Sequence, residues 1–298
     1  MTWNAGRHLG ALPLLAGGWL VALASCSLLT PLDGLSTGAT DDAEAGTSGT
    51  SGTSGSAGSS GSPDGSPQGD AGPLPAALYA NAVLADGPIA YFHLDETAGP
   101  TARSAVGTTM GTFEGMFAFG AESAVGPGGT SVTLDGTSAR LDFGDVFAFA
   151  GTVSYSLECW FKPSITGDTR FLFERRTTAS PAEGYTVYFG TSYFLFARQT
   201  GTVEFGYAST DATTTIGAWR HVVTTFNGTV TELYIDGVSV GKNVGATGAI
   251  GGGAGKFVLG DNTGGQFNKL GGQVDEFAVY DKGLTAAQVA LHFQAAKR

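Results

Sequence analysis

The stretch AWRHVVTTFNGTVTELYIDGVSVG, residues 218–241, decides the fold class. Apolar and polar residues alternate in WRHVVTTF (219–226) and again in TVTELYID (229–236), which is the period-two pattern of a β-strand with one buried face. Asn227-Gly228 separates these two runs, and Asp236-Gly237 follows the second. An Asx-Gly pair between alternating runs is the strongest short-range signal for a tight hairpin. The stretch therefore predicts consecutive antiparallel strands joined by tight turns.

A catalytic motif also occurs in this stretch. Gly237-Val238-Ser239-Val240-Gly241 matches the G-x-S-x-G pattern of serine hydrolases. A nucleophile elbow needs a strand, a strained turn and then a helix, because the helix lifts the serine clear of the sheet. Ser239 instead follows an Asp-Gly turn and precedes another short strand, and a chain with 48 glycines produces such matches by chance. The motif therefore indicates a hairpin and not a hydrolase.

Comparable alternating runs fill the chain from residue 77 onward. In VSYSLECWF (153–161), Tyr155, Leu157 and Cys159 fall on one face, whereas Glu158 and Trp160 fall on the other. The same pattern occurs in PIAYFHL (88–94), TSARLDF (137–143), RFLFERR (170–176), YTVYFG (185–190), SYFLFAR (192–198), TVEFGYA (202–208), KFVLG (256–260) and QVDEFAVY (273–280). More than ten short strands between turn residues predict an all-β fold, a two-sheet sandwich or a barrel.

One helix is expected, at the end of the chain. Thr285 precedes AAQVALHFQAAKR, and Gln288 three residues later completes a capping box. Val289 and Phe293 form a narrow apolar stripe on this segment, so one side of the helix is expected to pack on the domain.

The first residues have the features of a secretory leader. A short region with Arg7 precedes the apolar run ALPLLAGGWLVALAS (11–25), which is shorter than the roughly 20 apolar residues of a membrane-spanning helix. Leu23-Ala24-Ser25-Cys26 resembles the bacterial lipobox, which implies cleavage before Cys26 and lipid on its sulfur. We expect residues 1–25 to be a lipoprotein signal peptide; the alternative is an ordinary secreted protein with a chance cysteine. Ser27 after the cysteine points to the outer membrane in enterobacterial sorting.

Residues 26–76 differ in composition from everything that follows. They are rich in Gly, Ser and Thr, and from residue 27 to 75 they contain no Lys, Arg or aromatic residue. Such a segment buries too little apolar surface to offset the entropy of ordering, so it is expected to be a disordered tether for the domain at 77–298. The net charge of −11 argues against nucleic acid as a partner, although part of that charge lies in the tether.

The two cysteines do not predict a disulfide. Cys26 is assigned to lipid, and Cys159 lies in an apolar strand pattern. A secreted domain held by disulfides would have an even set of spaced cysteines. We expect Cys159 to be a small buried apolar residue.

Several motifs, in their expected order, resemble LamG-like jelly rolls of the concanavalin A-like lectin/glucanase superfamily. The similar segments are VLADGPIAYFHLDETAG (83–99), LDGTSARLDFG (134–144), the 218–241 stretch and GGQVDEFAVYDKGLTAAQVALHF (271–293). The resemblance implies a two-sheet antiparallel jelly-roll sandwich with a short C-terminal helix. One departure is ARSAVG (102–107), where family members often have an Asp-x-Ser-Gly pattern. Fold alone does not settle function.

Glycoside hydrolysis requires two carboxylates that face each other. Glucanases of this superfamily carry them in an E-x-D-x-x-E run, and the sequence has none. Asp275 and Glu276 are adjacent, so their side chains are expected on opposite faces of a strand. Glu158 and Glu174 lie on two strands that could be neighbours and could face each other, although solvated strand faces explain them better. His93, His221 and His292 show no metal-binding spacing, and we interpret His221 as a packing residue.

Two kinds of binding residue are expected. The resemblance implies a structural Ca²⁺ that bridges the closing strand and the early part of the domain through Asp275, with Asp95 and Asp135 as further oxygen ligands; a turn aspartate such as Asp135 more often only forms an Asx turn. Sugars stack on exposed aromatic rings. The aromatic residues expected to be exposed are Trp160, Tyr188, Tyr193 and Tyr207.

The sequence therefore predicts a lipid-anchored protein of the bacterial cell envelope whose LamG-like domain binds a glycan or a protein without catalysis. One alternative is a structural interaction module with no affinity for glycans. The other is a glycoside hydrolase of unusual architecture, which would depend on Glu158 and Glu174.

Overall fold

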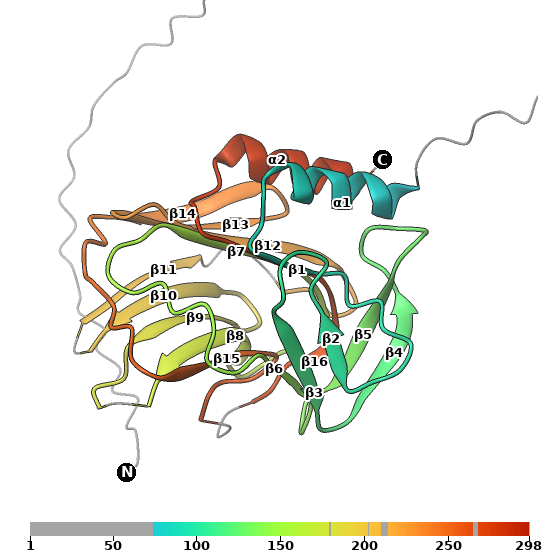
Figure 1. Ribbon diagram of the computed structural model, residues 1–298, viewed down its shortest axis with the longest axis horizontal. Coiled ribbons are helices and arrows are strands. Elements are labelled where there is room, and N and C mark those ends of the chain that lie inside the picture. Colours follow the sequence, from blue (N-terminus) through green and yellow to red (C-terminus); the bar gives the residue numbers. More distant parts are fainter. Residues whose placement is uncertain (1–73, 179, 202, 210–213, 265–267, 298) are drawn as a thin grey trace, which may run out of the picture. The chain divides into compact units, whose positions relative to one another are not determined.

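The computed structural model describes residues 74–178, 180–201, 203–209, 214–264 and 268–297. Over these residues the strands form two eight-stranded antiparallel sheets that pack face to face, with two helices on the outer face of one sheet (Figure 1). Sheet A contains, in spatial order, β14 (Val238–Val244), β13 (Val230–Ile235), β12 (Arg220–Phe226), β7 (Tyr155–Pro163), β16 (Gly271–Tyr280), β5 (Thr130–Asp135) and β4 (Phe117–Glu122), while β1 (Ala90–Phe92) also pairs with β16. Sheet B contains β11 (Val203–Ser209), β10 (Phe194–Thr200), β9 (Gly184–Phe189), β8 (Arg170–Thr177), β15 (Gly255–Leu259), β6 (Arg140–Asp142), β3 (Met110–Glu114) and β2 (Thr101–Arg103).

The main core lies between the two sheets, as the alternating runs predict. Tyr155, Leu157, Cys159 and Phe161 of β7 all point into it and are fully buried. The expectation that Cys159 is a small buried residue is therefore confirmed. The predicted jelly-roll sandwich with a C-terminal helix is confirmed as well.

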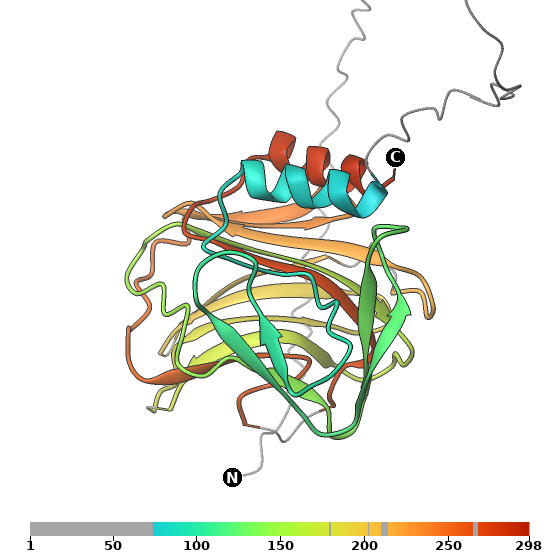
Figure 2. The ribbon, with the colours of Figure 1, turned by 45° about the vertical axis from the view of Figure 1, so that its right-hand side comes forward.

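A second core lies between sheet A and the helices α1 (Pro75–Ala85) and α2 (Ala286–Ala295), which lie side by side over this sheet (Figure 2). The predicted capping box of α2 is present: the Thr285 side chain accepts from the Gln288 backbone N–H, and the Gln288 side chain accepts from the Thr285 backbone N–H. Val289 is fully buried and Phe293 partly buried, which confirms the predicted apolar stripe.

Helix α1 and strands β2 to β5 were not predicted from the sequence. The domain was predicted to start at residue 77, whereas α1 begins at Pro75, so the last two residues of the predicted tether are helical. Leu74 at the N-cap offers no side-chain bond to the helix, and α1 contains no charged residue. Helix α1 therefore has little local signal and owes its stability to packing, through Tyr79 and Val83.

The opening hairpin forms as predicted. Asp236 and Gly237 both have positive φ, 53° and 80°, and join β13 to β14. A Cβ at Gly237 would lie 2.9 Å from the Phe293 Cβ, so α2 as well as the turn favours glycine here. Ser239 lies on β14 and donates to Glu232 Oε1 at 2.6 Å. A strand and not a helix follows the turn, so no nucleophile elbow forms.

None of the helices in the described part of the chain is long and apolar enough to cross a membrane.

Candidate functional site

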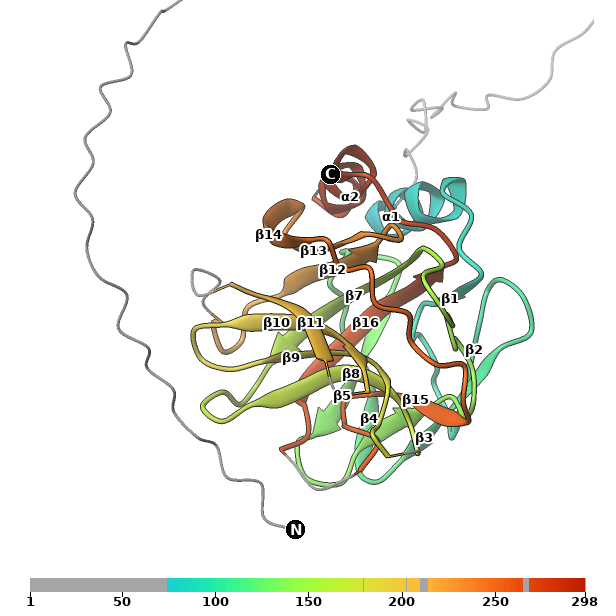
Figure 3. The ribbon, with the colours of Figure 1, turned by 90° about the vertical axis from the view of Figure 1, so that its left-hand side faces the viewer.

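The two outer faces of the sandwich have different environments. Helices α1 and α2 cover the outer face of sheet A, and in the described residues no helix lies over the outer face of sheet B (Figures 2 and 3). The outer face of sheet B is therefore the broad strand surface that a ligand could approach.

An apolar row crosses this face. Phe171 of β8 is the cross-strand partner of Tyr188 of β9, and Tyr188 is the partner of Leu195 of β10. The ring centroids of Phe171 and Tyr188 are 5.6 Å apart, and those of Tyr188 and Tyr193 are 6.4 Å apart with nearly perpendicular planes. All four side chains are half-buried. The structure thus brings together two of the predicted ligand residues, Tyr188 and Tyr193, and adds Phe171 and Leu195.

Polar groups lie on the same face beside the apolar row. The Arg176 guanidinium donates to Gln199 Oε1 at 2.7 Å, and its Nη1 lies 3.9 Å from Glu174 Oε2. Glu174 accepts from the backbone N–H and the hydroxyl of Thr263, at 2.9 and 2.8 Å. Burial raises the pKa of the Glu174 carboxyl, and Thr263 and Arg176 only partly offset that effect. We name Phe171, Tyr188, Tyr193 and Leu195, together with Glu174, Arg176 and Gln199, the sheet B patch.

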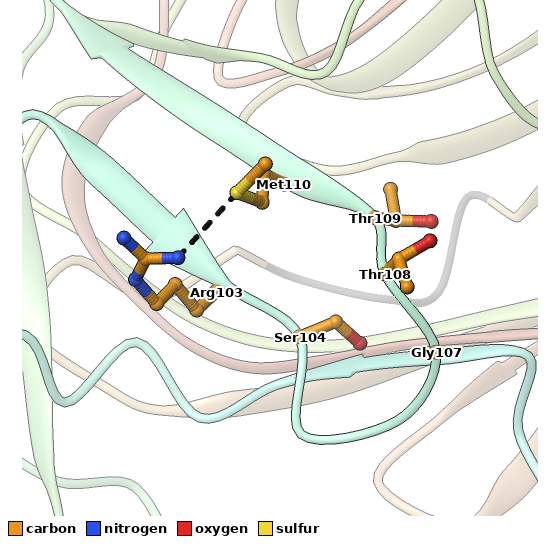
Figure 4. A pocket seen from close by; sticks show the side chains of 6 residues that line it. All are labelled: Arg103, Ser104, Gly107, Thr108, Thr109 and Met110. Carbon is orange, nitrogen blue, oxygen red and sulfur yellow. Dashed lines mark hydrogen bonds between the residues drawn. The ribbon is translucent and has the colours of Figure 1, made fainter.

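A hollow of about 300 Å³ at the end of sheet B does not form a convergent site. It is lined by Arg103, Ser104 and residues 107–110, part of the loop that departs from the family pattern (Figure 4). The Arg103 guanidinium points to Met110 Sδ, 3.6 Å away, and the hydroxyls of Thr108 and Thr109 point away from it. The Ser104 hydroxyl donates to the backbone carbonyl of Val106 and accepts from the backbone N–H of Tyr91. The guanidinium and the hydroxyls therefore do not point to a common position where one ligand could contact them all.

The expectation that Trp160 is exposed is wrong. Its side chain lies on the outer face of sheet A, as the alternation requires, but α1 and α2 cover that face and the residue is fully buried. Its ring stacks on Phe293 of α2 at 5.8 Å and lies 4.8 Å from His221. The side chain of Tyr207 lies outside the described residues, as does Cys26.

Beside Trp160, a buried polar cluster links both helices to sheet A. Glu158 is fully buried and accepts from the hydroxyls of Tyr79 and Tyr280, at 2.7 and 2.9 Å. His221 Nε2 lies 2.8 Å from Glu158 Oε1, and His292 Nδ1 lies 2.9 Å from Oε2. Burial by itself would raise the pKa of Glu158, but His292 and His221 outweigh it and hold that pKa well below the ordinary value. His221 is buried as expected, and it is also a hydrogen-bonding partner.

The proposed pairing of Glu158 with Glu174 does not occur. Glu158 lies on β7 of sheet A and faces the helices, whereas Glu174 lies on β8 of sheet B and faces the opposite side of the sandwich. The chain crosses between the sheets after β7, so strands that are neighbours in sequence are not neighbours in space. The pair therefore cannot act on one glycosidic bond.

Asp275 and Glu276 also differ from expectation. A β-bulge interrupts the pairing of β16 with β7 at this point, and Glu276 has φ = 51°. Both side chains consequently reach the helix-covered side: Asp275 accepts from Ser123 and Ala124, and Glu276 accepts from Tyr91. Burial raises the pKa of both carboxyls, and for Asp275 the nearby Glu276 adds to the rise. The prediction of opposite faces failed because a bulge adds a residue to the period of two.

The three residues predicted as calcium ligands are not grouped together. Asp275 Oδ2 accepts two hydrogen bonds while Oδ1 is buried without a partner, which leaves an oxygen that a cation would satisfy. Asp95 lies nearby, since a Cβ at Gly129 would be 3.6 Å from Asp95 Oδ1 and 3.2 Å from the Ser123 hydroxyl that bonds Asp275.

Asp135 does not belong to that group. It pairs with Gly271 at the far end of β16 from Asp275, and its carboxylate accepts from the backbone N–H groups of residues 137–139 in its own turn. Asp275 therefore has one oxygen free for a cation, and Asp95, which accepts from Thr130, lies near it, whereas Asp135 lies elsewhere. Within the described ranges, no three His, Cys, Asp or Glu side chains are grouped as a metal site.

Most of the residues described above could be recognised in the sequence, but the residues that they contact could not. Phe171 and Leu195 occur in the predicted strands, but only the strand register shows that they flank Tyr188. Asp86 and His292 are 206 positions apart and meet only because α1 and α2 pack together. The sequence carries no local signal for such contacts.

Comparison with solved structures supports the fold. Domain 4 of the GH43 extracellular arabinanase AbnA from Geobacillus stearothermophilus, solved with arabinotriose, matches with a TM-score of 0.55 and 19% identity over 70% of this chain and 98% of that chain. The binding domain of Paraclostridial Mosquitocidal Protein 1 matches with a TM-score of 0.55 and 13% identity, over 70% of this chain and 52% of that one. The binding domain of botulinum neurotoxin serotype D matches with a TM-score of 0.55 and 11% identity, over 72% and 52%. The match thus spans about half of each toxin chain.

No curated protein matched the sequence. A laminin G family model, described as the concanavalin A-like lectin/glucanases superfamily, matches residues 135–290, just over half of the chain. These residues include β6 to β16 and the start of α2, and the motifs on which the resemblance was stated lie in large part within them. The chain therefore belongs to the concanavalin A-like lectin/glucanases superfamily.

Proposed function

We propose that this protein binds carbohydrate without catalysis, through the sheet B patch. The observation that carries the proposal is the row of Phe171, Tyr188 and Leu195 across three adjacent strands, with Tyr193 at its side. Aromatic rings bury the apolar face of a sugar, and the half-buried Arg176 and Gln199 supply hydrogen-bonding groups for its hydroxyls. The outer face of sheet A cannot serve because helices cover it.

The structural neighbours are consistent with a binding role. One of them was solved with arabinotriose, and others are binding domains of toxins. At identities below 20% these neighbours support only the shared fold. The ligand of this chain has to be inferred from the residues of its own sheet B patch.

The test is a glycan array that includes arabinotriose, probed with the full-length chain, Tyr188→Ala and Leu291→Ala. Leu291 is the matched control, since it is exposed on α2 at the other side of the sandwich. We expect one class of glycan to be retained, binding to fall about threefold to tenfold in Tyr188→Ala, as the loss of roughly 0.5–1.5 kcal/mol per aromatic contact predicts, and Leu291→Ala to match the parent. Binding by Tyr188→Ala that equals that of the parent would reject the patch. A blank array from folded protein would reject carbohydrate and favour a protein partner in the cell envelope, which cross-linking on intact cells would identify.

We also propose that Cys26 carries lipid and anchors the protein to the outer membrane or cell surface, with residues 26–76 as the tether. The lipobox-like Leu23-Ala24-Ser25-Cys26 behind an apolar run supports this proposal. Fractionation of cells that produce the parent and Cys26→Ser is the test. The parent is expected in the membrane fraction and the variant is not; an equal distribution would contradict the anchor.

We propose further that Asp275 and Asp95 hold a structural Ca²⁺. The cation would bind Asp275 Oδ1, which is buried and has no hydrogen-bond partner. A ligand that binds only the folded state raises Tm, by an amount that grows with the ratio of its concentration to Kd. Millimolar Ca²⁺ should raise Tm of the parent relative to EDTA. Asp275→Asn should abolish the rise and Asp135→Asn should keep it. A parent whose Tm is the same in Ca²⁺ and EDTA would reject the site.

A further inference from the structure

All three histidines in the described part of the chain lie on the helix-covered face of sheet A, each against a carboxylate. His93 approaches Glu276, while His221 and His292 approach Glu158. His292 differs from the other two because both of its ring nitrogens face carboxylates: Nδ1 lies 2.9 Å from Glu158 Oε2, and Nε2 lies 3.0 Å from Asp86 Oδ2. The second nitrogen of His221, Nδ1, is buried and has no partner.

This geometry sets a requirement on the proton count of His292. A neutral imidazole carries one N–H and one acceptor nitrogen, whereas the imidazolium carries two N–H donors. Carboxylates accept only, so a neutral His292 would turn a lone pair toward either Glu158 or Asp86. His221 and His93 each satisfy one carboxylate and need only one N–H. Among these histidines, His292 alone requires the protonated form to satisfy its contacts.

The same residue links three elements of the fold. His292 is on α2, Asp86 is the C-cap residue of α1, and Glu158 is on β7 of sheet A. Gln288 of α2 also donates to Asp86, and the Tyr79 hydroxyl of α1 donates to Glu158. The contacts that hold both helices on the sheet therefore meet at one ring.

We propose that the helix layer is held by a pH-dependent latch, in which protonated His292 bridges Glu158 and Asp86 and loss of that proton loosens α1 and α2 from sheet A. Deprotonation would leave one of the two carboxylates facing a lone pair, so either the α1–α2 contact or the α2–sheet contact weakens. The proposal concerns the helix layer and is independent of the ligand and of the sheet B patch.

In the described part of the chain, the titratable groups around His292 come from α1, from sheet A and from the end of α2. Helix α1 contributes Tyr79 and Asp86, and the sheet contributes Glu158, His221 and Tyr280; Lys297, just beyond α2, lies 5.1 Å from the centroid of the Trp160 ring. Burial raises the pKa of both tyrosines well above its ordinary value, so they remain neutral donors throughout the working range.

The direction of the effect follows from the histidine. Burial by itself would lower the pKa of His292, but Glu158 and Asp86 reverse this and raise it above the ordinary value. A raised pKa in the folded state contributes stability that is fully present below the unfolded value of about 6.5 and is lost as pH rises through the folded value. The latch is thus closed in mild acid and opens toward alkaline pH.

The test is hydrogen exchange of the full-length chain between pH 6 and 9, with rates corrected for the intrinsic pH dependence of exchange. We expect protection of 75–85 and 286–295 to fall as pH rises, while protection of β7 stays constant. Asp86→Asn is the decisive variant. Removing the carboxylate should shift the loss of helix protection to lower pH, and because Asp86 is near the surface the substitution should not unfold the domain. Asp281→Asn, which removes an exposed aspartate in the turn before α2, should behave like the parent.

Two results would overturn the latch. One is helix protection that does not change with pH in the parent. The other is a fall at the same pH in Asp86→Asn and the parent. The imidazole titration of His292, followed by NMR, gives a second measurement: its midpoint should drop in Asp86→Asn and stay unchanged in Asp281→Asn.

Discussion

Glu158 and Glu174 point outward from the two different sheets, and the pKa values of their carboxyls shift in opposite directions. Both point outward from alternating strands and both are nearly inaccessible, at 0% and 2% exposure. Glu158 lies under two helices among two histidines and two tyrosines, and its pKa is held well below the ordinary value. Glu174 has Thr263 and a more distant Arg176, and burial raises its pKa. Burial alone therefore does not set the charge state of a carboxyl; the partners that the fold delivers do.

The two outer faces also differ in whether their large outward side chains are covered. The outward aromatic residue of β7, Trp160, became part of a second core because helices cover it, whereas Tyr188 of β9 remains at the surface. In this domain, a large outward side chain is accessible to a ligand only where no helix lies above it.

The largest expected effect comes from Trp160→Ala. Removing a fully buried indole leaves a cavity between sheet A and α2, and such truncations destabilise by about 3–5 kcal/mol. Tyr188→Ala on the open face should lower the free energy of unfolding by about 1 kcal/mol or less, while it weakens glycan binding. Urea unfolding of both variants measures the difference. Equal losses would show that the helix layer does not bury Trp160 in solution.

The next effect sharpens the comparison of the two glutamates. Glu158→Gln breaks a buried ionic network and should cost about 3 kcal/mol at pH 7. Glu174→Gln should change the unfolding free energy by less than about 1 kcal/mol, because an amide oxygen can still accept from Thr263. Denaturant unfolding at one pH compares them directly. A Glu174 variant as unstable as the Glu158 variant would contradict the assigned difference in charge state.

A smaller effect is expected from Thr285→Ala, which removes the N-cap of α2. Loss of such a cap costs about 1 kcal/mol. If the helix layer and the sandwich unfold as one unit, the loss will appear in global unfolding. If it appears only as faster exchange in 286–295, the layer opens on its own, as the latch requires.

The smallest effect is expected from Ser239→Ala. Ser239 is exposed on β14 and its hydroxyl donates to Glu232, so removing the hydroxyl should change the unfolding free energy by no more than about 0.5 kcal/mol. Esterase and peptidase assays of parent and variant should give the same background. A parent activity lost in the variant would revive the hydrolase interpretation.

Much of the fold could be predicted from particular residues. The Asx-Gly turns and alternating runs located the strands from β6 onward, and Thr285 with Gln288 located α2, because these signals are local. Strands β2 to β5 were not predicted because apolar and polar residues alternate only weakly among their glycines. Helix α1 was not predicted because it has neither a side-chain cap nor a charged residue. Among the proposed ligand residues, composition and phase placed Tyr188 and Tyr193 on an outer face, as the structure has them. The exposure of Trp160 was misjudged because Phe293 of α2, which covers it, lies more than a hundred residues away in sequence.

By itself the sequence determined the all-β class, the hairpin at 236–237, the inward phase of β7 and the absence of a nucleophile elbow at Ser239. These follow from steric and periodic rules that act over a few residues. Only the tertiary structure decided which outer face is covered, that Glu158 and Glu174 lie on different sheets, that a bulge turns Asp275 and Glu276 to one side, and that Asp86 meets His292. Those outcomes depend on crossovers between sheets and on helix packing, which join residues that no local pattern connects.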